Sequence, residues 1–543
     1  IETYTVGFGS SLTVNGRQYL NDAATGEDLD EKNNSFYFSA SNSNDLNKAF
    51  DSIFNNIAAS SLINKNQSYS VATPAINEQE NPSLLLSATL DTAQWISDIK
   101  LYDVTNGKVN TKKYKNPNYH NDNRKIIVNT GNNNEWLDKA NLSNQFFGLY
   151  NADSSAWKKM VNWIARKEVP ADYRNNGNMG AIIDSPIVAV KDLKEKQNKY
   201  LIAGSNDGMV YLFENNGKGY DLKLNYMPAT MPKQDKTMAQ YLSKQASTSY
   251  GQDVDNQPEY LLNGGILART TSGNKAKSNA NKQTFMAMNM GQGGKGMFTL
   301  HISGNDVNGK PVGLDNDDML SSVPMFEAKE NGLEYTVSTP HIGRVSLSEG
   351  ISKDVFYAVF IANGYADDRN EVKNTNSELH IYKALKNDVG LDSTDTETKQ
   401  SKAEIIKKIN VGKTGGLSEP TLIDTDLNGV IDVVYAGDYQ GNMYRFDLRS
   451  KVDDWKVTKI FSGDQPITSA PAVLKKGKNE YVVIWGTGSD LYADDSTDKT
   501  QQSVYGIYDN IDEPVQYVTT KRDLFEQRWA ESTEQYRTVM PMT

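Results

Sequence analysis

The sequence predicts a mainly β fold, a modified β-propeller of about seven blades with long insertions. From about Ser68 onward, short apolar runs are broken by Gly, Asn and Asp, and few stretches have a helical period. Two segments of the pattern strand, glycine turn, strand share the spacing of Ala, Gly, Tyr and Phe, namely Ala203–Phe213 and Ala436–Phe446. A proline also precedes four apolar runs, at Pro186, Pro340, Pro420 and Pro471.

Looser copies of the hairpin end at Ile381-Tyr382 and at Ile507-Tyr508, each with a polar insertion between its strands. Proline at the start of a strand, glycine at the turn and an aromatic residue between neighbouring sheets are features of propeller blades. Because the four prolines are unevenly spaced, we expect blades that carry long insertions or that lack a recognisable signature.

The opening segment has a different character. Two strand patterns, Ile1–Gly9 and Phe36–Phe38, precede a helical pattern formed by Leu46, Ala49, Phe50, Ile53 and Ile57. This order resembles the C-terminal end of a von Willebrand factor A domain, although none of the metal-ligand motifs of that domain occurs here. We therefore predict an α/β segment over residues 1–62 and a propeller over residues 63–543; a strand-helix cap on the propeller is the alternative. Since the chain begins inside a strand pattern, we expect a fragment whose targeting signal lies upstream.

Composition excludes several classes of function. The 543 residues carry a formal net charge of −11 without a cluster of Lys and Arg, so nucleic acid is not the expected partner. The absence of cysteine excludes disulfides and thiolate chemistry. No apolar run is long enough to span a bilayer, so we predict no transmembrane segment in this chain.

The segment Asp424–Asp432, with the sequence D-T-D-L-N-G-V-I-D, has the spacing of a calcium loop. Such loops place side-chain oxygens at alternate positions before a glycine turn and add a backbone carbonyl after it. The predicted ligands are the side-chain oxygens of Asp424, Asp426, Asn428 and Asp432 and the carbonyl of Val430. Gly429 provides the turn.

Strand-forming residues flank this loop, Pro420–Ile423 before it and Val433–Ala436 after it, so we expect the loop to join two β-strands. It is not an EF-hand, because position 12 is Tyr435 rather than Glu. The alternative is a simple Asn428-Gly429 hairpin turn with solvated aspartates. Against this alternative, three carboxylates within nine residues repel one another, and a bound calcium ion would remove the repulsion.

Six stretches, in this order, resemble the C-terminal part of the PilC/PilY family of type IV pilus biogenesis and adhesion proteins. They are Tyr69–Ile76, Trp95–Val104, Arg124–Asn129, Gly180–Val190, Gly291–Ile302 and Thr421–Leu448. The resemblance implies an exported protein at the cell surface, pilus or outer membrane of a Gram-negative bacterium. It also implies a role in virulence, with pilus subunits or minor pilins and the host-cell surface as partners.

The same resemblance implies that calcium in the Asp424–Asp432 loop controls pilus extension versus retraction, and with it twitching motility and adhesion. No R-G-D tripeptide occurs, so an integrin-binding mechanism is not expected. We predict no enzymatic activity. Two alternatives remain: a quinone-dependent dehydrogenase-like propeller enzyme, which bound quinone would reveal, and an integrin-like calcium propeller acting only in cell contact, which would bind several calcium ions.

Overall fold

The structure is a computed structural model. It describes residues 5–8, 20, 37–40, 49, 68–71, 84–105, 108–120, 123–191, 198–271, 282–306, 309–349, 355–386, 399–524, 529–530 and 538–539. The chain divides into two compact units, Ile1–Tyr69 with Asp91–Ala93, and Ser70–Leu90 with Gln94–Thr543.

In the first unit, β1 (Thr5–Phe8) pairs in parallel with β2 (Tyr37–Ala40). Both strands lie where the sequence predicts strands. Apart from Ala49, which is helical, the predicted helical pattern falls outside the described residues. The likeness to a von Willebrand factor A domain and the domain boundary after residue 62 therefore stay predictions.

Six sheets of three or more strands contain most of the described β-structure. Their strands are β3 (Ser68–Val71), β4 (Leu84–Asp91), β5 (Ile96–Thr105) and β6 (Lys108–Lys115); β7 (Ile126–Asn129), β8 (Asn134–Trp136), β9 (Ile187–Lys191), β10 (Asn198–Ser205), β11 (Met209–Asn215) and β12 (Tyr220–Met227); β15 (Ile266–Thr270), β16 (Gln283–Asn289), β17 (Met297–Gly304) and β18 (Pro324–Ala328); β19 (His341–Ser346), β20 (Val355–Ala362), β21 (Ser377–Lys386) and β22 (Lys399–Gly412); β23 (Thr421–Ile423), β24 (Val433–Gly437), β25 (Met443–Asp447), β26 (Lys456–Ser462) and β30 (Thr519–Thr520); and β27 (Ala472–Gly477), β28 (Glu480–Gly486) and β29 (Val504–Asn510).

The remaining elements are short. They are the strand pairs β13 (Pro232–Lys233) with β14 (Lys236–Thr237) and β31 (Trp529–Ala530) with β32 (Thr538–Val539); the α-helices α3 (Ala156–Ile164), α4 (Leu242–Ala246) and α5 (Met319–Ser322); and the 3-10 helices η2 (Gln145–Phe147), η3 (Met238–Tyr241), η5 (Gly291–Gly293), η6 (Gly313–Asp315), η7 (Arg369–Asn374), η8 (Val452–Asp454), η9 (Ala493–Thr497) and η10 (Lys521–Asp523). Within the described part of the chain, no helix combines the length and the apolar character needed to cross a membrane.

The four predicted proline positions each mark the start of a sheet. Strands β9, β19, β23 and β27 begin one residue after Pro186, Pro340, Pro420 and Pro471. Proline suits this position because its fixed φ continues into an extended chain and its missing N–H is not needed before the ladder begins.

The predicted hairpins are also present. The two close copies form β10–β11 and β24–β25, and the two looser copies form β20–β21 and β28–β29. In each looser copy the two strands pair although the polar insertion separates them along the chain. These pairings confirm the repeat that the sequence predicts.

Alternate residues of the central strands pack against different neighbouring sheets. On β20, Tyr357, Val359 and Ile361 share a hydrophobic cluster with residues of β16 to β18, whereas Phe356 and Phe360 share one with residues of β24 and β25. Because successive side chains of a strand point to opposite faces, each such sheet is covered on both sides. The sheets therefore stack face to face.

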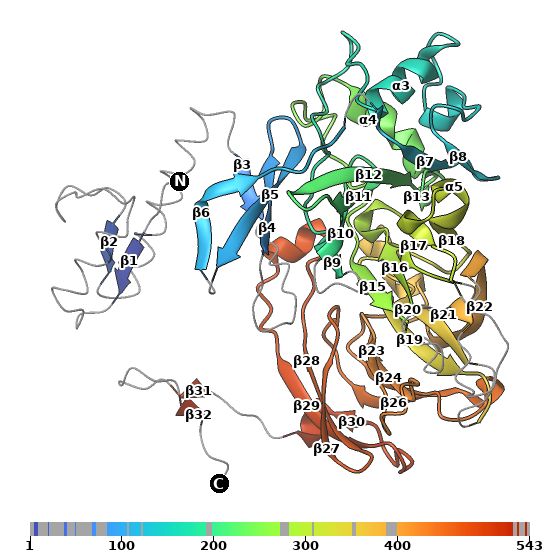
Figure 1. The fold of residues 1–543 in the computed structure, drawn as a ribbon. Helices are drawn as coiled ribbons and strands as arrows, with labels where there is room; N and C mark the ends of the chain where they lie inside the picture. The colour runs from blue at the N-terminus through green and yellow to red at the C-terminus, as the bar shows by residue number, and fades with distance from the viewer. Residues whose placement is uncertain are drawn as a thin grey trace. The chain divides into compact units, whose positions relative to one another are not determined.

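Contacts between the sheets follow the strand order. The first strand of one sheet contacts the first strand of the next, in the series β9, β15, β19 and β23, and the fourth strands β18, β22 and β26 also form a series. Figure 1 shows these sheets following one another from green through yellow to orange. This is the arrangement of propeller blades, first strand against first strand and fourth against fourth.

The mainly β fold with insertions is confirmed. The described residues contain six sheets of three or more strands, against the prediction of about seven blades. The sheet β15–β18 is a blade without the proline signature, because the residues before Ile266 are Gly264 and Gly265.

Candidate metal centre

The acidic segment Asp424–Asp432 forms the connection between β23 and β24, which pair antiparallel. Ile423 and Val433, the residues on either side of the segment, are partners in that ladder. The prediction that this loop joins two β-strands is therefore confirmed. Because the ladder closes directly below the loop, both ends of the acidic segment are held close together.

Three of the predicted ligand residues come together at this loop. Asp424, Asp426 and Asp432 each offer a carboxylate oxygen, and these oxygens lie within 4.8 Å of one another. The Oδ1 atom of Asp424 is buried and has no hydrogen-bond partner among the residues that the structure describes. A buried carboxylate oxygen without a donor is unfavourable unless something positive lies beside it.

Burial raises the pKa of Asp424, and the nearby Asp432 and Asp426 carboxylates raise it further. A hydrogen bond from the Gly429 amide, at 2.6 Å from Asp424 Oδ2, acts in the opposite direction. The net pKa of Asp424 is raised, which is the direction expected for clustered carboxylates that lack a counter-ion.

Asn428 and Val430, the other two predicted ligand residues, lie in the same turn. The Asn428 side chain donates from Nδ2 to Asp426 Oδ2 at 2.8 Å, and its Oδ1 accepts from the Val430 amide at 2.8 Å. The Asn428 amide also donates to Asp426 Oδ1 at 3.1 Å. The structure thus brings three carboxylates together and uses Asn428 to orient Asp426 and the backbone at Val430.

Asp432 is fixed at the base of the loop. Its Oδ2 accepts from both the amide and the hydroxyl of Thr425, at 2.8 and 2.6 Å. Its own amide donates to the Ile423 carbonyl at 2.9 Å, and its carbonyl accepts from the Leu448 amide at 2.8 Å. Because backbone and side chain are both held, Asp432 supplies a positioned carboxylate.

A neighbouring sheet supports the turn through Arg344 of β19. Its Nε donates to the Gly429 carbonyl at 2.7 Å and its Nη2 donates to the Asn428 carbonyl at 3.2 Å. Gly429 has a φ of +88°, and a Cβ at this position would collide with the Arg344 guanidinium. Glycine therefore suits the left-handed backbone conformation here, and a larger residue would also displace the Arg344 guanidinium from the turn.

Sequence reasoning did not identify Arg344, which is 85 residues from Gly429, or Lys475, which is 50 residues from Thr425. The Lys475 ammonium donates to the Thr425 carbonyl at 2.8 Å. No sequence signal marks either residue, because each reaches the loop from another sheet.

The side chains of Arg344 and Lys475 donate to backbone carbonyls of the loop rather than to its carboxylates. Among the residues that the structure describes, no ion pair joins Arg344 or Lys475 to a loop carboxylate. The loop therefore presents three clustered carboxylates, one of them with an unsatisfied buried oxygen. A site with only oxygen ligands suits a hard divalent cation such as calcium, so the residues present fit that ion.

Stacked β-sheets with an acidic hairpin loop between two strands define a β-propeller protein with a candidate cation site. The chain belongs to the PilY1 beta-propeller domain family, which matches residues 185–534. The acidic loop, Arg344 and Lys475 all lie within the matched region.

Similar proteins include type IV pilus biogenesis factors PilY1 of Pseudomonas aeruginosa. The factor of strain UCBPP-PA14 is 27% identical over 264 residues, 42% of this chain and 19% of the relative. That of strain PAK is 27% identical over 344 residues, 56% of this chain and 24% of the relative. A PilY1 homolog of Xylella fastidiosa strain Temecula1 is 25% identical over 314 residues, 56% of this chain and 21% of the relative.

The matched regions thus span a quarter or less of the length of these relatives. Among solved structures, the crystal structure of the Pseudomonas aeruginosa PilY1 C-terminal domain covers 60% of this chain and 61% of that chain. The sequence identity is 21% and the TM-score is 0.39.

Proposed function

We propose that this chain is the propeller part of a type IV pilus biogenesis factor and that it binds one calcium ion in the Asp424–Asp432 loop. The observation that carries the calcium proposal is the cluster of three carboxylates with an unsatisfied buried oxygen on Asp424. Membership of the PilY1 propeller family supports the role at the pilus. The protein acts at the cell surface or pilus of a Gram-negative bacterium, with pilus subunits or minor pilins and host cells as partners.

The chain acts without catalysis, as a calcium-dependent regulator. With calcium bound, the three carboxylates hold the loop closed between β23 and β24; without it, their mutual repulsion favours opening. Calcium shifts this equilibrium only to the extent that it binds the closed loop more tightly. The pilus machinery then responds to the state of the loop, which sets extension versus retraction and hence twitching motility and adhesion.

One calcium ion, rather than several, is the expected stoichiometry. In the described ranges, the group of Asp424, Asp426 and Asp432 is the one cluster of three potential metal-ligating side chains. An integrin-like propeller would need several such loops. The single cluster therefore favours a regulatory site in one blade.

Calorimetric titration of calcium into the 543-residue chain tests the site. We expect one site with a dissociation constant of roughly 0.1 to 10 µM. The double variant Asp424→Ala with Asp432→Ala removes two carboxylates, and we expect its affinity to fall by about 100-fold or more, the equivalent of about 2.7 kcal/mol.

A matched control is Asp253→Ala with Asp255→Ala, which removes two exposed aspartates from another loop. It changes the net charge equally, so calcium binding should match that of the unmodified chain. Equal binding by all three proteins would show that the loop is an ordinary turn.

The pilus role is tested in the bacterium that encodes the chain, with the Asp424→Ala and Asp432→Ala changes introduced into its gene. We expect the number of surface pili to differ between calcium-containing and chelator-treated cells of the unmodified strain. In the variant strain the count should no longer depend on calcium, because the loop has lost its ligands. A pilus count that responds to calcium equally in both strains would contradict regulation through this loop.

A further inference from the structure

A pocket of about 220 Å³ lies outside the region that matches the propeller family. It is formed by the chain around β7, by the segment that follows β8, and by the C-terminal half of α3 with the residues after it. Strand β7 joins β12 in parallel and so extends its sheet beyond the four strands β9 to β12. The pocket is thus built from elements added to one blade.

The floor of this pocket is apolar. Ile126, Leu137 and Ala165 are buried, and Trp136 and Val161 are half-buried. All five belong to the large hydrophobic cluster of this part of the molecule or pack against it. The floor therefore offers an aromatic ring and aliphatic groups to whatever enters.

The rim is basic. Lys125, Lys139 and Lys167 line the pocket and are exposed, whereas Asp138 is the one carboxylate among the lining residues. Among the described residues, none of the three lysine ammonium groups has an ion-pair or hydrogen-bond partner. The pocket therefore has a positively charged rim, although the chain as a whole has a net charge of −11.

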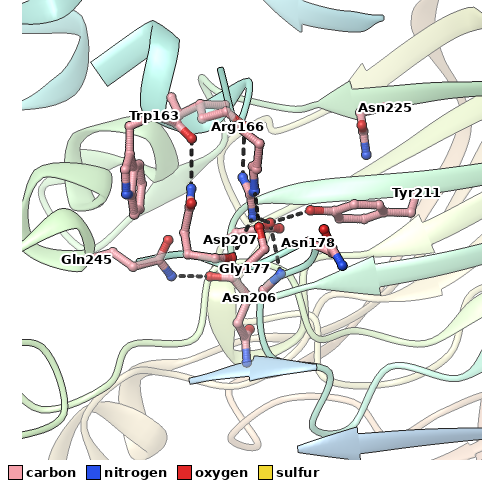
Figure 2. Close-up of polar contacts among 12 residues, drawn as sticks. Trp163, Arg166, Gly177, Asn178, Asn206, Asp207, Tyr211, Asn225 and Gln245 are labelled. Atoms are coloured by element: carbon pink, nitrogen blue, oxygen red, sulfur yellow. Dashed lines mark hydrogen bonds and ion pairs between the residues drawn. The ribbon is translucent and has the colours of Figure 1, made fainter. Parts of the chain in front are cut away.

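Buried positive charge lies behind the pocket wall. Arg124, which also lines the pocket, is buried and donates from Nη2 to the Asn178 carbonyl at 2.6 Å. Arg166 follows Ala165 in the wall, and its Nη2 lies 2.5 Å from Asp207 Oδ2. Figure 2 shows Arg166 and Tyr211 meeting at Asp207. Two buried guanidinium groups and one buried carboxylate thus lie behind the wall, and their net charge adds to the positive potential of the pocket.

Hydrogen bonds at the C-terminal end of α3 make the pocket wall rigid. Arg166 Nη1 donates to the Ile164 carbonyl at 2.8 Å, and Asn176 donates to the Trp163 carbonyl at 2.7 Å. The end of α3 is thereby fixed to the buried polar network of Arg166, Asp207 and Tyr211. Three pocket-lining residues lie in or directly after α3, namely Val161, Ala165 and Lys167. A site whose wall is fixed in advance loses little conformational entropy on binding.

We propose that this pocket binds an acidic, extended peptide segment of a partner protein. One apolar side chain of the segment enters against Trp136, and carboxylates on either side of it pair with Lys125, Lys139 and Lys167. Charge complementarity identifies the partner as acidic. The volume is below the roughly 300 to 1,000 Å³ of small-molecule sites, so it suits one or two side chains rather than a metabolite.

The test uses the 543-residue chain and a fluorescein-labelled peptide of alternating glutamate and leucine, with binding followed by fluorescence anisotropy. We expect saturable binding that weakens by at least tenfold in the triple variant Lys125→Glu, Lys139→Glu, Lys167→Glu. Since these lysines are exposed, the variant should keep its circular dichroism spectrum and its midpoint of thermal unfolding.

The control variant, Lys310→Glu with Lys413→Glu and Lys499→Glu, makes the same charge change at exposed lysines outside the pocket. It should bind the glutamate-leucine peptide as the unmodified chain does. A glutamate-serine peptide of equal length tests the apolar floor and should bind at least tenfold more weakly.

Several results would overturn the proposal. Equal loss of binding in both triple variants would indicate a general charge effect, and equal affinity for the leucine and serine peptides would remove the role of the floor. Saturable binding of heparin, a sulfated glycan, with none of the glutamate-leucine peptide would assign the pocket to a different class of partner.

Discussion

The substitution Asp207→Asn is expected to lower the free energy of unfolding by about 3 to 5 kcal/mol, the cost of breaking a buried ion pair. Asp207 Oδ2 accepts from Arg166 Nη2 at 2.5 Å, from Tyr211 OH at 2.5 Å and from the Gly180 amide at 3.0 Å. Arg166 and Asp207 are almost wholly buried, with side chains 3% and 2% exposed. Asparagine keeps the shape of the side chain but removes its charge.

The loss is large because the surrounding charge is positive. With Asp207 neutral, the Arg166 guanidinium remains inside the protein without the carboxylate that it pairs with. Burying a charge without a partner is among the most costly changes in a protein interior. Asp207 lies in the turn between β10 and β11, whereas Arg166 lies just after α3 (Figure 2). The ion pair between them therefore joins the α3 segment to the sheet that contains β10 and β11.

Equilibrium urea unfolding followed by tryptophan fluorescence measures this change, with Asp172→Asn as the control. Asp172 pairs with Lys159 at 3.9 Å, and both side chains are more than half exposed, at 63% and 59%. An exposed pair of this kind contributes about 0 to 1 kcal/mol. If Asp207→Asn shifted the unfolding midpoint no more than Asp172→Asn does, the buried pair would not stabilise the fold.

The substitution Glu378→Gln is expected to lower the free energy of unfolding by about 1.5 to 3 kcal/mol at pH 7, the range for a hydrogen bond to a charged group. Glu378 is buried, and its Oε2 lies 2.9 Å from His380 Nε2 and 3.1 Å from Lys408 Nζ. Its Oε1 accepts from Asn410 Nδ2 at 2.8 Å. Glutamine keeps the volume but no longer provides a charged acceptor for Lys408.

The same site makes stability depend on pH. Burial by itself would raise the pKa of Glu378, but hydrogen bonds from His380 and Lys408 outweigh it, and the net pKa is lowered. The pKa of Glu330, on the other side of His380, is lowered in the same way by bonds from His380 and Tyr382. Both carboxylates therefore hold their protons less tightly in the folded protein than in the unfolded chain.

A lowered carboxylate pKa contributes stability that is fully present above the unfolded value of about 4.3 and is lost as the pH falls through the folded value. The difference in free energy of unfolding between the unmodified chain and Glu378→Gln should therefore be largest near neutral pH. It should shrink at acidic pH, where the carboxylate is protonated in both states.

Urea unfolding at a series of pH values between about 3 and 7 measures this difference, spanning the ordinary glutamate pKa. Glu513→Gln is the matched control, because Glu513 is exposed and should show a small difference that does not vary with pH. A constant difference between Glu378→Gln and the unmodified chain over this range would contradict the role assigned to the charge.

Local features of the sequence predicted many of the propeller strands and the two strands that flank the candidate metal centre. Strands β9, β19, β23 and β27 begin directly after prolines because proline restricts its own backbone and cannot donate to a ladder. The Asp424–Asp432 loop joins two strands, as its flanks predict, because strand propensity and turn chemistry act over a few residues. Calcium in that loop stays a prediction that the titration decides.

Other parts depend on residues that are distant in the sequence. The sheet β15–β18 has no proline before it, and the face that each strand turns to its neighbour depends on stacking with the next sheet. Arg344 reaches the acidic loop from 85 residues away, and no local pattern distinguishes it from other arginines. The same holds for the pairing of Arg166 with Asp207 over 41 residues.

The sequence by itself determined the mainly β class, the starts of four sheets, the repeated hairpins and the acidic loop, because each is encoded by the backbone preferences of adjacent residues. Only the tertiary structure decided which charges are buried together, which cations support the loop, and that Lys125, Lys139 and Lys167 surround one pocket. The physical reason is that charge interactions and packing depend on distance in space, which the folded chain alone defines.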